Sequence, residues 1–455
     1  MNRKYVFAAI VPLVVSMGCK KILDVDQPMY IPMDEAIQSG NDVERILLSA
    51  YDGLQSGNVL GGNFVMFADL LADDTKVNEN NLYPFGTLEI YNRTTTMQIG
   101  ILRSCWADCY RTINKANTVI DAIDNNAFED EYFSIHKERM KGEALFIRAV
   151  VHYELIRFWT NAYDIENQGG NTSPGIPYRL TPTKSGFEGY DLARNTVEEC
   201  YDYIIADLIA AEQFLTISNR IVSVNRASAM AATAYLARVY FYKGDYANAL
   251  ASAETVINSG KYSFNENIAD AFRTNGNTIS NEVIFQVVFT TIDQNSDYQG
   301  NAIRGNYSAS GGYAPLFQGA LELKDLFLTS DTRRYGYISY NPFRQEVYAA
   351  KYTVSSQEHN VCIIRLQEIY LIAAEAYYYL NDTRCYDIIR ILQHRAHGED
   401  YNPSLIWKQL PEIITDERRR ELIFEGDRYH NLRRLKQPLR NGVAWNDPSL
   451  LFKIP

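Results

Sequence analysis

Apolar residues recur with a helical period along much of the chain. Within 137–159 and within 102–122 they stand three or four positions apart, which places them on one face of a helix. We therefore predict two amphipathic helices, with buried faces formed by Met140, Ala144, Ile147, Val151, Leu155 and Phe158 in the first and by Trp106, Cys109, Tyr110, Ile113, Asn117 and Ile120 in the second.

The start of a third helix is marked by its polar residues. Thr196 and Glu199 have the spacing of a capping box, in which each side chain binds a backbone N–H group of the other residue. The helix that follows is expected to bury Cys200, Tyr203, Ile204, Leu208 and Ala211.

Residues 227–260 predict a helical hairpin. Gly244-Asp245 breaks the first helix, Asp245 can cap the second, and Ser259-Gly260 can end it. The small Ala249 lets the second helix approach the first closely, which is typical of a tetratricopeptide repeat.

A weaker copy of this hairpin is predicted for residues 363–395. Asn381-Asp382 takes the place of the Gly-Asp break, and Tyr386 stands where the repeat has a small residue. Its first helix is expected to carry Leu366, Ile369, Tyr370, Ala373, Tyr377 and Leu380.

The segments between these helical blocks are rich in Gly, Asn, Ser and Tyr, and only Val283 to Thr291 reads as a short strand. We therefore expect a mainly α fold: a tetratricopeptide-like helical-hairpin scaffold with long irregular loops and a few short strands. The scaffold would occupy about 34–265 and 359–440 of a single unit, 34–455. An irregular segment at about 266–358 would form a ligand face, because long loops usually carry function.

The N-terminus predicts export. Basic Arg3 and Lys4 precede an apolar run from Tyr5 to Val15, small residues and then Cys19, the order of a secretory signal peptide. We expect residues 1–18 to be removed, Cys19 to carry lipid and 19–33 to form a tether. Ser16 stands where a lipoprotein signal usually has Leu, so an ordinary signal peptide with a chance cysteine is the alternative.

The net charge and the chemically reactive residues restrict the possible functions. Loss of Arg3 and Lys4 takes the formal net charge from −11 to −13, without the basic footprint of a nucleic-acid-binding protein. The five other cysteines are odd in number and widely spaced, so we expect buried thiols, including Cys105 and Cys109. We expect His394 and His397 to be surface residues, and no metal or cofactor. No catalytic motif is present, although a pair of glycosidase carboxylates among the 55 acidic residues stays open as an enzymatic alternative.

The stretch from Glu417 to Arg434 looks basic but predicts a structural, ion-paired segment. Thr415 can cap a helix in which Asp416 pairs with Arg420 four residues on. Gly426 would then stop this helix, and Asp427 would start the next.

Several motifs in the same order resemble those of the SusD/RagB family of Bacteroidetes outer-membrane lipoproteins. The resemblance covers essentially the whole chain, and the central hairpin is one of its parts. The other matching residues are Cys19 to Asp24, Trp106, Tyr110, Ile113, Ala116 and Asn117, Gly142 to Ala144 with Arg148-Ala149 and Arg157-Phe158, Arg365-Leu366 with Glu368 to Leu371 and Ala374 to Ala376, and Glu417-Arg418, Glu421-Leu422, Phe424 to Gly426, Arg428 and Leu432 to Arg434. Gln367 and Asn431 depart from the family pattern.

The resemblance implies a non-catalytic binding protein, lipid-anchored at the cell outer membrane and facing the exterior. It implies a SusC-like TonB-dependent transporter as partner and an oligosaccharide, or in some relatives a peptide, as ligand. At 455 residues the chain is short for the family, which suggests trimmed ligand-face loops.

Two loops offer the mix of aromatic rings and polar groups that suits sugars. They lie at 73–91 and 298–313. Neither contains tryptophan, which favours a peptide or a small, unusual glycan as the alternative. The candidate ligand-binding residues are Asp73, Asn81, Tyr83, Phe85, Tyr91, Tyr298, Arg304, Tyr307 and Tyr313.

Overall fold

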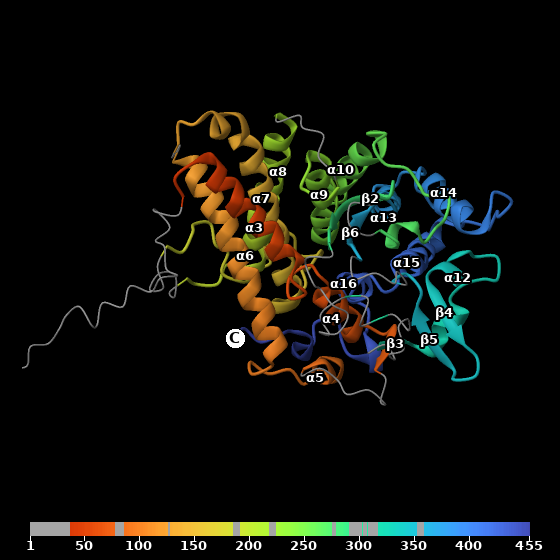
Figure 1. Cartoon of the computed structure of the whole chain (residues 1–455). Helices are drawn as coiled ribbons and strands as arrows, with labels where there is room; N and C mark the ends of the chain where they lie inside the picture. The colour runs from red at the N-terminus through yellow and green to blue at the C-terminus, as the bar shows by residue number, and fades with distance from the viewer. Residues whose placement is uncertain are drawn as a thin grey trace, which may run out of the picture. The chain divides into compact units, whose positions relative to one another are not determined.

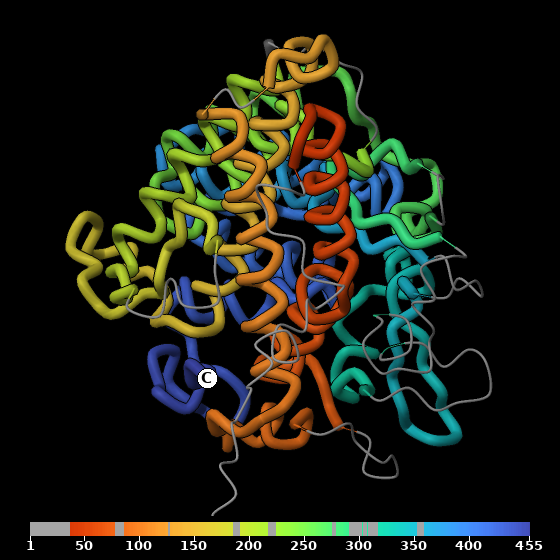
Figure 2. The backbone as a smooth tube through the Cα atoms, turned by 60° about the vertical axis from the view of Figure 1, so that its left-hand side comes forward, coloured from red at the N-terminus to blue at the C-terminus, as the bar shows by residue number. Residues whose placement is uncertain are grey.

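Helices that follow one another in the chain pack side by side and form the larger part of the fold in this computed structural model (Figures 1 and 2). Each helix in the following series contacts the next one. The helices are α3 (Gly40–Gln55), α6 (Gly100–Asp124), α7 (Glu131–Trp159), α8 (Val197–Ile217), α9 (Ala229–Lys243), α10 (Tyr246–Asn258), α13 (Leu366–Tyr379) and α14 (Cys385–His397).

The structure describes residues 37–77, 86–125, 128–184, 192–217, 224–274, 279–290, 303, 307, 317–352 and 359–455. Within these ranges, Ser39–Pro455 forms one compact unit. The expected signal peptide and Cys19 lie outside the described residues. No helix in the described ranges is both long enough and apolar enough to cross a bilayer.

The helix starts follow the residues that the sequence marked. Thr196 and Glu199 form the expected capping box, in which the Glu199 carboxylate accepts from Thr196 N at 2.8 Å and Thr196 Oγ1 accepts from Glu199 N at 3.2 Å. Asp130 caps α7 by accepting from Phe133 N at 2.8 Å. Local side chains therefore satisfy the first free N–H groups of these helices.

Both predicted hairpins are present. Gly244 ends α9 with a φ of +74°, and Asp245 caps α10 by accepting from Asn248 N. In the second hairpin Asn381 takes the left-handed conformation, with a φ of +58°. This second unit is shorter than predicted, because strand β6 (Val361–Arg365) occupies its first residues.

Short strands join the helical blocks. The predicted strand is confirmed as β2 (Val283–Val287), which pairs antiparallel with β6. A four-stranded sheet has the order β1-β3-β5-β4. Its strands are β1 (Thr75–Val77), β3 (Phe317–Gly319), β4 (Ile338–Asn341) and β5 (Glu346–Ala349). Strands β2, β3, β4 and β5 lie within the segment expected to be irregular and are the short strands expected there.

The remaining elements cover the ends of the scaffold. They are α4 (Asn63–Leu71), α5 (Thr87–Asn92), α12 (Arg333–Gly336), α15 (Leu410–Glu421) and α16 (Asp427–Arg434), with 3-10 helices η1 (Asp270–Phe272), η3 (Leu321–Asp325), η4 (Trp407–Gln409), η5 (Arg440–Gly442) and η6 (Pro448–Leu450).

Helix α7 is buried on several sides rather than on one face, because α3, α6 and α8 all pack against it. Its polar residues are consequently paired: Arg148 Nη2 lies 2.6 Å from Asp207 Oδ1 of α8. One prediction for α8 was wrong, because Tyr203 is 38% exposed and stacks on Tyr178. Trp159 lies in the core, whereas Trp106 is half-buried.

Candidate functional site

The bases of the two candidate loops lie together. Strands β1 and β3 are antiparallel, and Val77 at the end of β1 is the register partner of Phe317 at the start of β3. The first loop, 73–91, includes β1 and continues after Val77, and the chain that follows the second loop, 298–313, enters β3 at Phe317. Two aromatic-rich loops that are far apart in sequence thus leave the same end of one strand pair, which only the tertiary structure shows.

The candidate ligand residues divide into two groups. Asp73, Tyr91 and Tyr307 are described by the structure. The others lie outside the described residues, and for them ligand contact stays a prediction: Asn81, Tyr83, Phe85, Tyr298, Arg304 and Tyr313.

Asp73 anchors the first loop to the C-terminal helices. Its carboxylate accepts from Arg428 of α16 at 2.9 Å through both oxygens. Burial alone would raise the pKa of Asp73, but the bond to Arg428 and its charge hold that pKa below its usual range. The next residue, Asp74, is bound by Arg419 of α15 at 2.9 Å. Two ion pairs therefore fix the start of β1.

Tyr307 anchors the second loop to α4. Its ring is 1% exposed, and its hydroxyl donates to Asp69 Oδ2 at 2.6 Å. Burial raises the pKa of Asp69 to about 8. We therefore assign Tyr307 to the support of the loop and omit it from the proposed ligand contacts, because a buried ring offers no face to a ligand.

Tyr91 is held by an arginine. The Arg440 guanidinium lies 3.7 Å from the centre of the Tyr91 ring, a cation–π arrangement. Arg440 Nη1 also donates to Leu70 O at 2.9 Å and to Ala72 O at 3.1 Å. The Tyr91 ring remains half-buried, with one face covered by Arg440.

A charged cleft lies where the helical scaffold meets β6 and the α15–α16 junction. It encloses about 660 Å³ of empty volume, its mouth included. Arg157 donates to both oxygens of Glu154, and Arg238 donates to Glu368 at 2.7 and 2.6 Å. No sequence motif marks this cleft, because its lining comes from five separate stretches of the chain: Leu60, Gly62, Phe64, Val65, Glu154, Arg157, Arg238, Cys362, Ile363, Glu368, Leu422, Glu425, Gly426 and Asp427.

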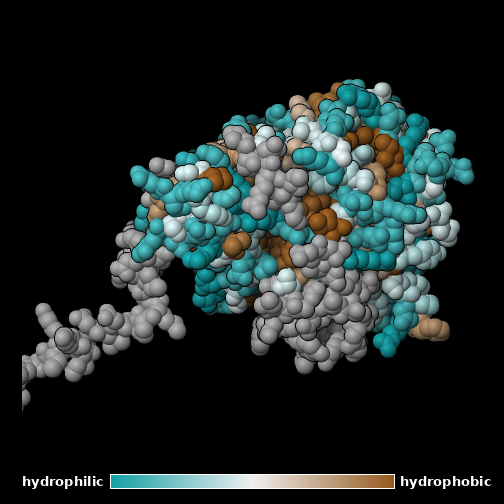
Figure 3. All heavy atoms as spheres, turned by 45° about the horizontal axis from the view of Figure 1, so that its top comes forward, coloured by the Kyte–Doolittle hydropathy of each residue, from teal (hydrophilic) through white to brown (hydrophobic). Residues whose placement is uncertain are grey.

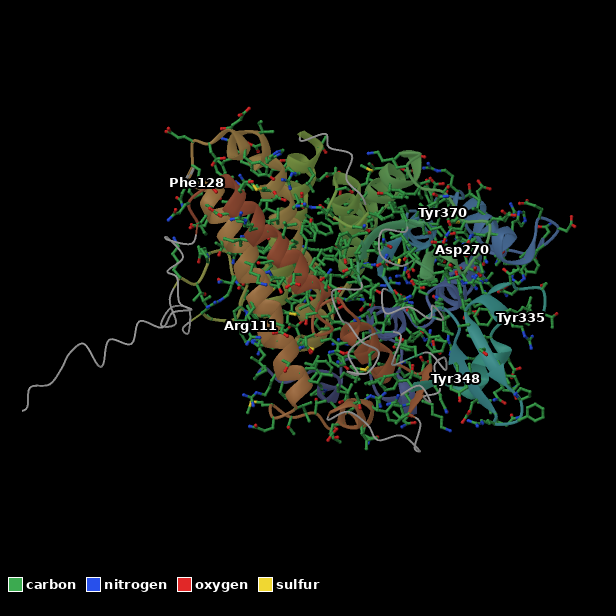
Figure 4. The ribbon with its side chains drawn as sticks, viewed as in Figure 1. Arg111, Phe128, Asp270, Tyr335, Tyr348 and Tyr370 are labelled. Atoms are coloured by element: carbon green, nitrogen blue, oxygen red, sulfur yellow. The ribbon has the colours of Figure 1, made fainter. Side chains whose placement is uncertain are left out.

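The β4–β5 hairpin presents further aromatic rings. Phe343 in its turn is 97% exposed, and Tyr335 just before the hairpin is 72% exposed. Asn341 stiffens the turn by accepting from Phe343 N at 3.0 Å. Figure 4 shows Tyr335 and Tyr348 at this end of the molecule, away from Arg111 and Phe128 on the helical side. The sequence analysis placed the hairpin in the ligand-face segment but named none of these rings.

Hydrophobic side chains are otherwise dispersed over the surface. Figure 3 shows a mainly hydrophilic face with separate hydrophobic patches. Exposed apolar residues such as Ile135, at 64%, and Leu328, at 57%, come from different elements. Scattered apolar residues of this kind are normal on soluble domains and do not define a site.

The basic C-terminal stretch is an ion-paired structural segment, as predicted. Arg418 is fully buried and donates to Asp427 at 2.8 Å through Nε. Two details were wrong. Thr415 lies inside α15, which starts at Leu410, and Arg420 donates to Glu417 three residues earlier rather than pairing with Asp416.

Gly426 also differs from its predicted role. Helix α15 ends at Glu421, so Gly426 does not stop it. Gly426 instead precedes α16 with a φ of +75°, and an added Cβ would meet Val65 Cα at 3.0 Å. The position therefore needs glycine both for its backbone conformation and for its close approach to α4.

Most of the described free thiols are buried. Cys105 and Cys109 are buried free thiols, as predicted. His397 was expected on the surface, but its side chain is only 4% exposed; it stacks on Tyr401 and lies 3.5 Å from Asp331. No described cluster of His, Cys, Asp and Glu has the arrangement of a metal site.

Comparison with known proteins gives a consistent result. A family model described as "starch-binding associating with outer membrane" matches residues 21–241, and the SusD family model matches residues 239–447. SusD-like protein P2 of Formosa agariphila is 23% identical over 95% of this chain and 91% of its own length. SusD-like protein P25 of the same organism is 23% identical over 66% of this chain, which corresponds to 53% of its own length.

Solved structures share the fold. A putative sugar-binding protein from Bacteroides vulgatus has a TM-score of 0.78 at 26% identity, over 92% of this chain and 96% of that one. A SusD superfamily protein from Bacteroides thetaiotaomicron has a TM-score of 0.78 at 22% identity, over 91% and 92% of the two chains. Because the two family models together match residues 21–447, the chain belongs to the SusD/RagB family.

Proposed function

We propose that this protein binds an oligosaccharide at the cell surface and delivers it to a SusC-like TonB-dependent transporter in the outer membrane. The observation that carries the proposal is the shared base of the two aromatic-rich loops at Val77 and Phe317, on a SusD scaffold. Aromatic rings with neighbouring amides suit the apolar faces and hydroxyl edges of sugars.

The comparisons support a sugar ligand. The family description refers to starch binding, and a structure with a TM-score of 0.71 and 21% identity, covering 92% of this chain, is a laminarin-binding SusD-like protein. The similar protein from Bacteroides vulgatus is described as a putative sugar-binding protein. Binding without catalysis fits a cleft whose carboxylates are tied up in ion pairs with arginine.

Calorimetry with the purified mature protein and a panel of oligosaccharides, including laminarin and starch fragments, tests the ligand. We expect Tyr83→Ala or Tyr313→Ala to weaken binding about three- to tenfold, the contribution of one aromatic contact. Ile135→Ala removes an exposed apolar side chain from α7 and serves as the control. If the protein binds peptides but none of the glycans, its ligand is a peptide rather than an oligosaccharide.

Fractionation and co-purification test the location and the partner. We expect the wild-type protein to sediment with outer membranes and to co-purify with a TonB-dependent transporter, and Cys19→Ala to be released in soluble form. A Cys19→Ala variant that stays membrane-bound would overturn the lipid anchor. Release of sugar from a polymer by the purified protein would overturn the non-catalytic role.

A further inference from the structure

A smaller pocket shares Arg157 with the charged cleft. It lies between the C-terminal end of α7, the segment after it and α16, and it encloses about 350 Å³ of empty volume, its mouth included. The side chains that matter for its chemistry are Arg157, Tyr201, His430, Arg433 and Arg434. Three arginines thus line a small space, and its electrostatic character depends on how their charges are balanced.

One of these arginines has no carboxylate partner among the described residues. Arg157 is bound to Glu154 at 3.0 Å, and Arg434 to Glu375 at 2.7 Å. Arg433 is 2% exposed, yet its hydrogen-bond partners among the described residues are all neutral: the carbonyl oxygens of residues 157, 160 and 445 and the Tyr429 hydroxyl. A buried guanidinium is expensive unless an opposite charge accompanies it, so the pocket carries one uncompensated positive charge.

Two of the arginines that line the pocket also have unused donors. The Nε atoms of Arg157 and Arg434 are buried and have no hydrogen-bond partner. An unmade hydrogen bond of a buried, charged donor is unfavourable, so an acceptor within reach of these atoms would be favourable. His430 adds no second charge, because burial and the nearby Arg157 and Arg433 hold its pKa well below the ordinary value.

We propose that this pocket binds one small monovalent anion, either chloride or the carboxylate of a small molecule. A single negative charge would balance Arg433, and its lone pairs would accept from the free Nε groups. A cation is excluded by the three arginines, and a water molecule would leave the charge of Arg433 unbalanced. The site is independent of the proposed glycan site: α16 carries Arg428 at one end, toward Asp73, and the pocket residues at the other.

The line width of the chloride NMR signal in the presence of the mature protein measures binding, because exchange with a protein site broadens it. We expect the wild-type protein to broaden the signal and added acetate or glucuronate to reverse the broadening if carboxylates enter. Arg433→Met should weaken binding at least about tenfold, since it removes the unbalanced charge. Arg45→Gln, which removes an exposed charge on α3, outside the pocket lining, should bind as the wild type does.

A second variant tests the site independently of whether Arg433→Met folds. Ala162 lines the pocket and is half-buried, so Ala162→Leu fills it and keeps every charge; it should also abolish the broadening. Chloride binding that acetate and glucuronate do not displace would support the site and restrict it to inorganic ions. Absence of broadening by the wild type, or equal broadening by Ala162→Leu, would show that the pocket holds only water and would overturn the proposal.

Discussion

The helical scaffold is stabilised differently from the C-terminal charged core, the ion-paired cluster of Arg333, Arg365, Glu417, Glu421 and Glu425. Between α6 and α10, apolar side chains fill the space between neighbouring helices, and a buried charge such as Arg148 meets its partner on the next helix. In the charged core, Glu421 of α15 binds Arg333 of α12 at 3.0 Å and Arg365 of β6 at 2.8 Å. These partners lie 88 and 56 residues away in the chain.

The difference shows what each kind of contact specifies. Apolar packing tolerates exchange of one hydrophobic residue for another of similar volume. A buried network of charges tolerates no loss of a partner, because the remaining charge is left in a medium of low polarity. The charged core therefore fixes where β6, α12 and α15 meet, and it also supports Asp73 and Asp74 at the base of the candidate loops.

The largest expected effect comes from breaking the charged core. Glu421→Gln keeps the shape but removes the charge that faces Arg333 and Arg365, and we expect it to lower the free energy of unfolding by about 3–5 kcal/mol. Urea denaturation measures this change. Arg45→Ala, which breaks the exposed Arg45–Asp42 pair at 2.7 Å, should change stability by less than about 1 kcal/mol. Similar losses of unfolding free energy in Glu421→Gln and Arg45→Ala would contradict the view that the charged core depends on its buried ion pairs.

A second effect depends on pH. The pKa of Asp69 is raised from 3.8 to about 8 by burial, so its stabilising contribution is complete below pH 3.8 and is lost as pH rises through about 8. Asp69→Asn removes the buried charge. Between pH 5 and pH 8 we expect the stability of the variant to rise relative to that of the wild type by up to about 4 kcal/mol, because the slope is at most about 1.4 kcal/mol per pH unit over three units.

Thermal unfolding of both proteins across this pH range provides the measurement for Asp69. Tyr307→Phe keeps the ring and the carboxyl group but removes the hydroxyl that donates to Asp69, so it should steepen the loss of stability above pH 7. Parallel pH profiles for the wild type and Asp69→Asn would show that Asp69 is ionised in the folded protein.

Backbone contacts at the α16 junction should give a smaller effect. Gly426→Ala combines a left-handed backbone with an approach to Val65 Cα, and we expect a loss of about 2 kcal/mol in denaturation experiments. Gly260→Ala is the matched control, because Gly260 has a φ of +65° but no atom within 4 Å of an added Cβ. Its loss should be only about 1 kcal/mol. Equal losses would mean that α4 moves aside.

The smallest expected effect lies at the edge of the helical scaffold. Thr196→Ala removes one half of the capping box of α8 and should lower stability by about 1 kcal/mol. Thr196→Ser keeps the hydroxyl acceptor and should have little effect in the same denaturation assay. A loss well above that of Gly426→Ala would mean that the scaffold is as sensitive to single polar contacts as the charged core.

The sequence by itself determined the helical scaffold. The period of apolar residues, the Thr196–Glu199 capping box and the break at Gly244-Asp245 are local signals, and local signals specify helices because their hydrogen bonds join residues four apart. The same information located the weaker hairpin. It failed for Tyr203, whose exposure depends on what α8 meets, and for Thr415, which lies within a helix that begins five residues earlier.

Only the tertiary structure decided how distant segments meet. Contacts across long stretches of chain pair Val77 with Phe317 and bury Tyr307 against Asp69. They also give Arg433 its neutral hydrogen-bond partners. Charged side chains give no sequence signal for their partners, since any Glu can bind any Arg that the fold brings near. The base of the candidate ligand site and the proposed anion pocket therefore follow from the packing of α4, α7 and α16 rather than from a motif.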